Sequence, residues 1–230
     1  MDHATIREIA ERTIVVRPPR QALATFGVTR VTYYLVTAPV LAEDEASSSE
    51  AVIRQGVVTA NRPQIVTPGY LLNLFDGFSH GEDFARYLAE TQGANSPGLL
   101  YSYQNELQDT EVVSDSPDTV VGRLVEQVNR EARDHAAVIR GVDHYWDISL
   151  GKFIFDLTVS SLGQTIGDLG RRGLLGSDNG VPRAARARID EMFAAVAAGQ
   201  LEPVELKREL DRWGIFSEYE DRFLGMFRRG

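Results

Sequence analysis

The sequence predicts an α+β fold, with a mainly antiparallel sheet in the N-terminal half that is packed by helices and followed by a helical C-terminal segment. Three observations predict it. Runs rich in β-branched and aromatic residues fall before position 115, a long apolar stretch covers residues 148–162, and three amphipathic patterns follow Pro182.

A short helix is expected from Asp2, and two strands follow it, over Thr13–Arg17 and Val28–Thr37. In the second run, apolar and polar side chains alternate in the way of a half-buried strand: Val31, Tyr33 and Leu35 against Arg30 and Thr32. After a polar loop, residues 52–60 and 64–67 also indicate extended chain. Asn61, Arg62 and Pro63 separate them, which predicts a hairpin.

Helix starts are marked by residues that can accept a hydrogen bond from the first turn. Thr67 precedes Pro68, and Ser79 with Glu82 three residues later fits a capping box. Strands are expected over 97–103 and 110–114, around a polar turn. A further helix begins at Ser116 and Pro117, and its apolar stripe comprises Val120, Val121, Leu124, Val125 and Val128.

Residues 148–162 are apolar almost all round a helix, which predicts a buried central helix. Six glycines then fall between Gly163 and Gly180, where they indicate a flexible connector. The predicted organisation is therefore a main domain over 1–162, a linker over 163–181 and a helical segment over 182–230.

Three short amphipathic helices are expected in the C-terminal segment. Their stripes are Ile189, Met192, Phe193 and Val196; Leu206, Leu210 and Trp213; and Phe223, Leu224 and Phe227. Helices of this length are marginal alone in water, so the stripes need something to pack against. A second copy of the chain would supply it, and we expect a homo-oligomer; the C-terminal helices could also bind another protein or fold back on the main domain.

Charge and composition disfavour several partners. The net charge of −9 lies wholly within residues 1–180, because residues 181–230 hold nine basic and nine acidic side chains. An acidic body repels the phosphates that supply most nonspecific nucleic-acid affinity. The chain has no cysteine, no apolar run of the length that crosses a bilayer, and charges throughout its first 12 residues. We expect a cytoplasmic protein without a membrane partner.

The candidate catalytic residues are Asp143, His144 and Asp147, in the run Asp143-His144-Tyr145-Trp146-Asp147. An imidazole and two carboxylates within five residues could perform acid–base chemistry if a pocket shifted their pKa values. The alternative is structural: Asp147 caps the following helix, the aromatic rings fill the core, and His144 lies at the surface. Whether the chain is an enzyme is left open.

No cofactor and no metal are expected. His80, Glu82 and Asp83 have the right donor types for a metal, but Glu82 already has a capping role and three side chains within one turn seldom converge. The glycine-rich run from Gly163 to Gly173 does not have the spacing of a phosphate loop, and neither GxSxG nor HExxH occurs.

Residues 189–210 resemble the short C-terminal helical (SHOCT-type) domain. The matching positions are Ile189, Met192, Phe193, Gly199, Leu201, Glu205, Leu206 and Leu210, with Glu202 where the family usually has Thr or Ser. The resemblance covers about a tenth of the chain and implies an interaction or oligomerisation element without catalytic residues. We therefore expect a non-catalytic interaction or assembly protein; the alternative is an enzyme that uses the 143–147 cluster.

Overall fold

Two compact units make up the chain. The computed structural model describes residues 3–39, 48–74, 90, 93 and 98–227. The first unit comprises residues 1–62 and 101–166, and the second comprises residues 63–100 and 167–230. The second unit therefore includes residues 63–100, from the middle of the chain. The division expected from the sequence, with boundaries at 162 and 182, assigned these residues to the main domain.

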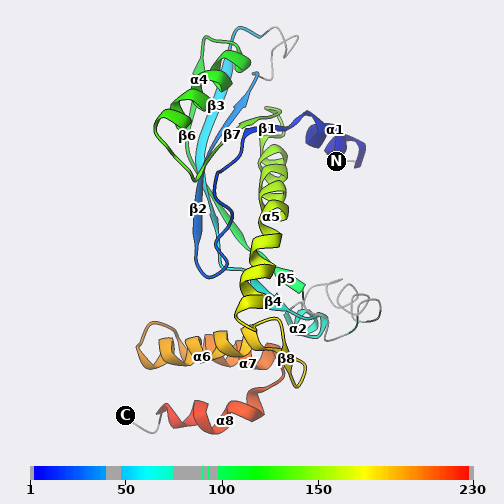
Figure 1. The fold of residues 1–230 in the computed structure, drawn as a ribbon, viewed down its shortest axis with the longest axis vertical. Helices are drawn as coiled ribbons and strands as arrows, with labels where there is room; N and C mark the ends of the chain where they lie inside the picture. The colour runs from blue at the N-terminus through cyan, green and yellow to red at the C-terminus, as the bar shows by residue number, and fades with distance from the viewer. Residues whose placement is uncertain (1–2, 40–47, 75–89, 91–92, 94–97, 228–230) are drawn as a thin grey trace. The chain divides into compact units, whose positions relative to one another are not determined.

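A five-stranded sheet forms the first unit, in the order β1-β7-β2-β3-β6 (Figure 1). Its strands are β1 (Ile14–Arg17), β2 (Thr29–Thr37), β3 (Ala51–Ala60), β6 (Tyr103–Val113) and β7 (Ala136–Arg140). β2, β3 and β6 form an antiparallel meander, whereas β7 lies parallel to β2 and antiparallel to β1. The α+β prediction is confirmed, with a mixed sheet.

Helices pack on both faces of this sheet. α5 (Trp146–Arg171) covers one face and α4 (Pro117–Arg130) the other, and α1 (His3–Arg12) precedes β1 (Figure 1). Because side chains alternate along a strand, Tyr33 and Leu35 of β2 belong to the core beneath α5, whereas Tyr34 and Val36 belong to the core beneath α4. All four are buried, so β2 is central in both cores.

The predicted helix starts at Thr67 and Ser116 are confirmed. Thr67 Oγ1 accepts from the Tyr70 N–H at 3.2 Å and begins α2 (Pro68–Leu74). Ser116 Oγ accepts from the Thr119 N–H at 3.3 Å and begins α4. The helix expected after Ser79 lies outside the described residues.

The strands differ from the prediction in two places. β3 does not form a hairpin with β4 (Gln64–Val66); β4 pairs instead with β5 (Gly98–Leu100), which lies more than 30 residues further along. β6 is continuous through the segment between positions 103 and 110, where a polar turn was expected. Its residues pair with β3 along its whole length, except at one bulge opposite Gln55 and Gly56.

The first half of the predicted linker is helical. α5 continues to Arg171, so Gly163, Gly167 and Gly170 lie inside a helix. Glycine costs about 1 kcal/mol at a helix position, and burial of Thr165 and Leu169 offsets that cost. The remainder forms the small hairpin of β8 (Ser177–Asp178) and β9 (Val181–Pro182), whose turn residues Asn179 and Gly180 have positive φ angles of 52° and 78°.

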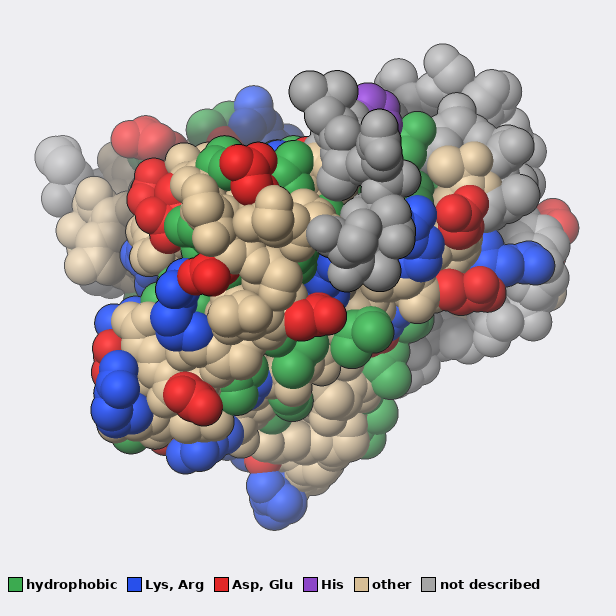
Figure 2. Space-filling view, turned by 90° about the horizontal axis from the view of Figure 1, so that it is seen from above, with side chains coloured by type: hydrophobic (Ala, Val, Ile, Leu, Met, Phe, Trp, Pro, Cys, Tyr) green, Lys and Arg blue, Asp and Glu red, His purple; other side chains and the backbone are tan. Residues whose placement is uncertain are grey.

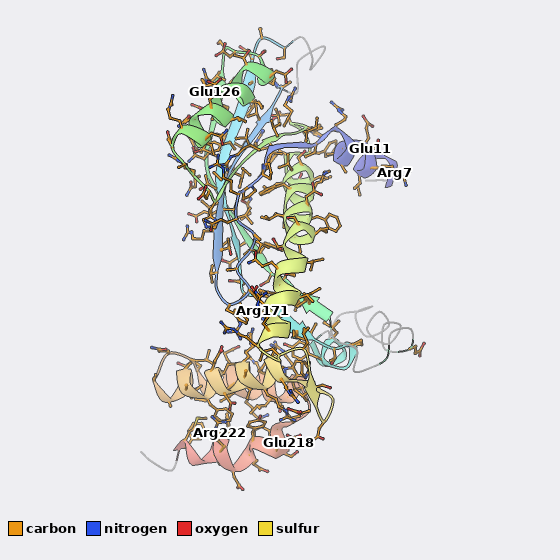
Figure 3. The ribbon with its side chains drawn as sticks, in the orientation of Figure 1. Arg7, Glu11, Glu126, Arg171, Glu218 and Arg222 are labelled. Atoms are coloured by element: carbon orange, nitrogen blue, oxygen red, sulfur yellow. The ribbon has the colours of Figure 1, made fainter. Side chains whose placement is uncertain are left out.

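Three helices close the second unit: α6 (Arg183–Ala197), α7 (Pro203–Arg212) and α8 (Phe216–Gly225). Their apolar stripes form one core, which comprises Val181, Ala185, Ile189, Phe193, Leu206, Leu210, Ile215 and Phe223. Arg222 of α8 (Figure 3) pairs with Asp190 of α6 at 2.5 Å and lies 4.0 Å from the ring centroid of Phe193. The first two stripes thus pack largely within the chain, whereas Leu224 and Phe227 of the third stripe stay exposed.

Charged side chains of both signs are interspersed on the face drawn in Figure 2. In the part of the chain that the structure describes, no helix combines the length and apolar character that crossing a bilayer requires.

Candidate functional site

Asp143 lies in an ion pair at the end of β7. Its Oδ1 accepts hydrogen bonds from Arg54 Nη1 of β3 at 2.6 Å and from Thr37 Oγ1 of β2 at 2.7 Å. The Arg54 and Asp143 side chains are only 14% and 12% exposed. Arg54 also lies 5.6 Å from the ring centroid of Trp146, at the start of α5. Asp143 therefore neutralises a nearly buried guanidinium and holds it against an indole ring.

Close packing continues beside this ion pair. Gly141 lies so near α5 that an added Cβ would be 2.9 Å from the Ser149 side chain and 2.7 Å from Leu35 Cδ1. Ser149 is fully buried; its Oγ accepts from the Val142 N–H at 3.2 Å and from Thr13 Oγ1 at 2.8 Å. The junction between β7 and α5 is thus filled by side chains of the protein.

The other two candidate catalytic residues lie at the surface. His144 is exposed, and its ring meets the Tyr145 ring edge-on at 4.6 Å between centroids. Asp147 is exposed in the first turn of α5, where a carboxylate interacts favourably with the helix dipole. Among the described residues, no hydrogen bond joins His144 to Asp143 or Asp147. His144 thus lies at the surface, whereas Asp147 is the second residue of α5 and does not precede the helix as a cap. The acid–base role stays a prediction.

Among the described residues, no three His, Asp or Glu side chains are grouped so that they could hold a metal ion. His80, Glu82 and Asp83 lie outside those residues.

The outer face of α5 is the most distinctive surface of the first unit. Six positions lie within an arc of about 80° at 100° per residue, directly opposite the buried Leu150, Phe153 and Leu157. They are Ile148, Gly151, Phe155, Val159, Leu162 and Ile166, and none is polar. Phe155 is 66% exposed, Val159 50% and Ile166 49%. We call these six residues the α5 stripe.

The α5 stripe corrects the prediction of a helix buried all round. Apolar residues on a helix predict that the face they form will be buried. The sequence does not say whether the same chain or another chain buries that face. Side chains project from α5 towards the sheet and also on its opposite side (Figure 3). Large exposed apolar patches are more frequent at interaction sites than elsewhere on protein surfaces.

Charged residues border the α5 stripe on one flank. Lys152 Nζ donates to Asp156 Oδ2 at 2.5 Å, and both side chains remain partly exposed. Beyond them is a cavity of about 380 Å³, lined among others by Pro18, Pro19, Asp156 and Leu157. All its polar lining residues are ordinary surface groups, and no buried unpartnered side chain points to a ligand there.

A smaller apolar surface lies on the second unit. Val196, Pro203, Met226 and Phe227 line a groove of about 700 Å³ between the C-terminal helices. Phe227 is exposed, as are Val204 and Leu224 nearby. This groove is the feature of the C-terminal segment that could contact a partner.

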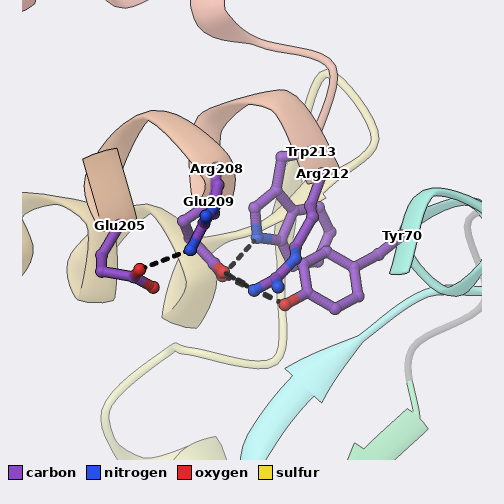
Figure 4. Close-up of polar contacts among 6 residues, drawn as sticks. All are labelled: Tyr70, Glu205, Arg208, Glu209, Arg212 and Trp213. Atoms are coloured by element: carbon purple, nitrogen blue, oxygen red, sulfur yellow. Dashed lines mark hydrogen bonds and ion pairs between the residues drawn. The ribbon is translucent and has the colours of Figure 1, made fainter. Parts of the chain in front are cut away.

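A buried carboxylate in the second unit was not found from the sequence. Glu209 of α7 is 4% exposed and accepts from Tyr70 Oη at 3.1 Å, Trp213 Nε1 at 3.2 Å and Arg212 Nη1 at 3.4 Å (Figure 4). Burial, and next the charge of Glu209, raise the pKa of Tyr70 to about 12. The tyrosine therefore stays a neutral donor. The spacings of Glu209 to Arg212 and to Trp213 are visible in the sequence, but Tyr70 comes from 139 residues away.

Comparison with protein-family models, with curated proteins and with solved structures finds no match to this chain.

Proposed function

We propose that this chain is a non-catalytic assembly protein that binds a second copy of itself through the α5 stripe. The observation that carries the proposal is the exposure of Phe155, Val159 and Ile166 on one helical face whose opposite side is fully packed. Burial of a large apolar side chain contributes about 1.5–3 kcal/mol. A helix that leaves three of them in water therefore has a strong drive towards association.

The expectation that the C-terminal segment holds copies together is the competing route. The resemblance of residues 189–210 to a SHOCT-type domain and the groove at Phe227 favour it. Against it, Ile189, Phe193, Leu206 and Leu210 are already buried in the same chain. By contrast, Phe155, Val159 and Ile166 of the α5 stripe stay exposed.

An enzyme that uses Asp143, His144 and Asp147 is the second candidate function. Asp143 is occupied by Arg54 and Thr37, and the two other side chains face solvent. General acid–base catalysis needs groups aligned on one substrate. This arrangement offers no such convergence, so we rank assembly first.

Light scattering across the micromolar range tests the proposal on the full chain. We expect a dimer for the wild-type protein and a monomer for Phe155→Asp, because an unpaired carboxylate in an apolar interface opposes association; a loss of at least about 100-fold in affinity is expected. Val28→Asp is the matched control: Val28 is 61% exposed, precedes β2 and does not belong to the α5 stripe, so its substitution should leave the dimer intact.

Two outcomes would overturn this proposal. One is a wild-type chain that stays monomeric throughout the concentration range. The other is a dimer that survives Phe155→Asp but is lost in Phe227→Asp, which would place the interface on the C-terminal segment. Thermal unfolding of each variant checks that it remains folded.

A further inference from the structure

We infer that two copies pair through an antiparallel contact of α5 with α5 of the second copy, with Phe155 on the two-fold axis. The arrangement rests on the proposed self-association and adds to it the register and direction of the helices. It follows from the positions, sizes and charges on and beside the α5 stripe.

Four positions of the α5 stripe lie in pairs at equal distances from Phe155, whereas Ile166 has no counterpart within the stripe. Ile148 and Leu162 lie seven residues before and after it, and Gly151 and Val159 lie four residues before and after it. When two antiparallel helices are related by a two-fold axis at one residue, each position faces the one equally far on the other side. Ile148 then faces Leu162 of the second copy, and Gly151 faces Val159.

The sizes of the facing residues fit. Gly151 has open space around it, since an added Cβ would meet nothing within 4 Å, and Val159 is an exposed branched side chain. Antiparallel pairing places Val159 of each copy against Gly151 of the other, so the bulky residue faces the small one at two symmetric positions. Parallel pairing would set Gly151 against Gly151 and Val159 against Val159, which leaves a void at one place and crowding at another.

The charges on the flank also fit the antiparallel direction. A two-fold axis perpendicular to both helices brings the same flank of each copy together, so Lys152 and Asp156 of one copy border Asp156 and Lys152 of the other. The two positions differ by about two residues along the axis, or about 3 Å, which a lysine side chain spans. The pairs inside each chain can thus extend into a four-membered network.

A second copy fits this surface better than a membrane does. Peripheral membrane helices carry rows of Lys or Arg beside the apolar face. The α5 stripe has a single Lys152 on its flank, beside Asp156, and the whole chain has a net charge of −9. Anionic lipid would repel an acidic chain, whereas the α5 stripe and its flank are complementary to the same surface on a second copy. These charges therefore favour self-association.

Disulfide trapping tests the arrangement directly, because the chain has no native cysteine and every crosslink is defined by the residue introduced. Bridged Cα atoms must lie within about 7 Å of each other. In the proposed pair, Phe155→Cys meets itself, whereas two Ile148→Cys residues lie about 21 Å apart along the axis. Ile148→Cys and Leu162→Cys face each other only when the two variants are mixed.

We expect a covalent dimer, after mild oxidation of the full-length variants, from Phe155→Cys alone and from the mixture of Ile148→Cys with Leu162→Cys. Ile148→Cys alone, Leu162→Cys alone and the surface control Val28→Cys should stay largely uncrosslinked. The mixed experiment keeps Phe155 in place, so it remains informative if Phe155→Cys weakens the dimer.

The two proposals fail in different ways. Crosslinking of Ile148→Cys with itself would show a parallel pair, and a dimer by light scattering that gives no mixed 148–162 crosslink would show another interface; either overturns the arrangement while self-association stands. A monomeric wild-type chain overturns both.

Discussion

The ring of Tyr33 lies directly against Gly56 on the neighbouring strand: a Cβ added to Gly56 would be 2.5 Å from the Tyr33 hydroxyl oxygen. The two residues are register partners on β2 and β3. Because glycine has no side chain, the tyrosine can cross β3 and donate from its hydroxyl to Asn105 Oδ1 of β6 at 3.0 Å. One side chain thereby connects three strands.

Gly56→Ala should destabilise the protein by about 1–3 kcal/mol, because the methyl group must displace a buried ring or bend β3. The free energy of unfolding in urea measures it. Gly122→Ala is the matched control: Gly122 lies in α4 with nothing within 4 Å of an added Cβ, so alanine should stabilise the helix by up to about 1 kcal/mol. Equal stability of the two variants would contradict the close contact.

Asp143→Ala should cost about 2–3 kcal/mol in the free energy of unfolding, because it leaves the guanidinium of Arg54 nearly buried without its counter-ion. Asp147→Ala removes an exposed carboxylate from the same segment and should cost less than about 1 kcal/mol. The double variant Arg54→Leu with Asp143→Leu should be more stable than Asp143→Ala alone. Similar losses for Asp143→Ala and Asp147→Ala would show that the ion pair contributes little.

The segment 143–147 shows what sequence can predict about a site and what it cannot. Its residue types and its place at the start of a helix were visible, although Asp147 lies in the first turn of α5 and not at the cap position expected for it. The partners of Asp143 were not, because Thr37 and Arg54 lie 106 and 89 residues away. Which of many acidic residues meets an arginine is decided by the fold.

The sequence predicted those elements of the fold whose local patterns agree with their tertiary environment. Alternation predicted β2, and the hydroxyls of Thr67 and Ser116 predicted two helix starts. β7 was missed because its residues Ala136–Ile139 are buried on both faces of the sheet and therefore do not alternate. Glycines suggested a linker where α5 in fact continues to Arg171 and Leu169 is buried.

Stability above pH 10 should report on Tyr70. Its pKa is raised to about 12 by burial, whereas an unfolded tyrosine ionises near its ordinary value of 10.0. The folded state therefore binds the proton more tightly, so the contribution of Tyr70 is full below pH 10 and is lost as pH rises from 10 to 12. Tyr70→Phe should show a weaker fall of unfolding free energy over this range.

The same variant has a consequence at neutral pH. Glu209 loses one of its donors, so Tyr70→Phe should be less stable than wild type by about 1–2 kcal/mol at pH 7. The two curves of unfolding free energy should then converge as the pH approaches 12. Parallel curves between pH 10 and 12 would contradict a raised pKa for Tyr70.

Gly151 separates the stability of the chain from the affinity between copies. Within one chain an added side chain at position 151 meets open space, so Gly151→Phe should leave the unfolding free energy of the dilute protein unchanged or slightly raised. In the antiparallel pair the same ring would collide with Val159 of the second copy. We expect at least a tenfold rise in the dissociation constant by sedimentation equilibrium, and Gly122→Phe on α4 should cause none.

Val159→Ala makes room for the ring, so adding it to Gly151→Phe should recover part of the affinity although Val159→Ala alone weakens the dimer. If the losses of binding free energy in the two single variants simply add in the double variant, residues 151 and 159 do not contact each other across the interface, because contacting residues show non-additive effects.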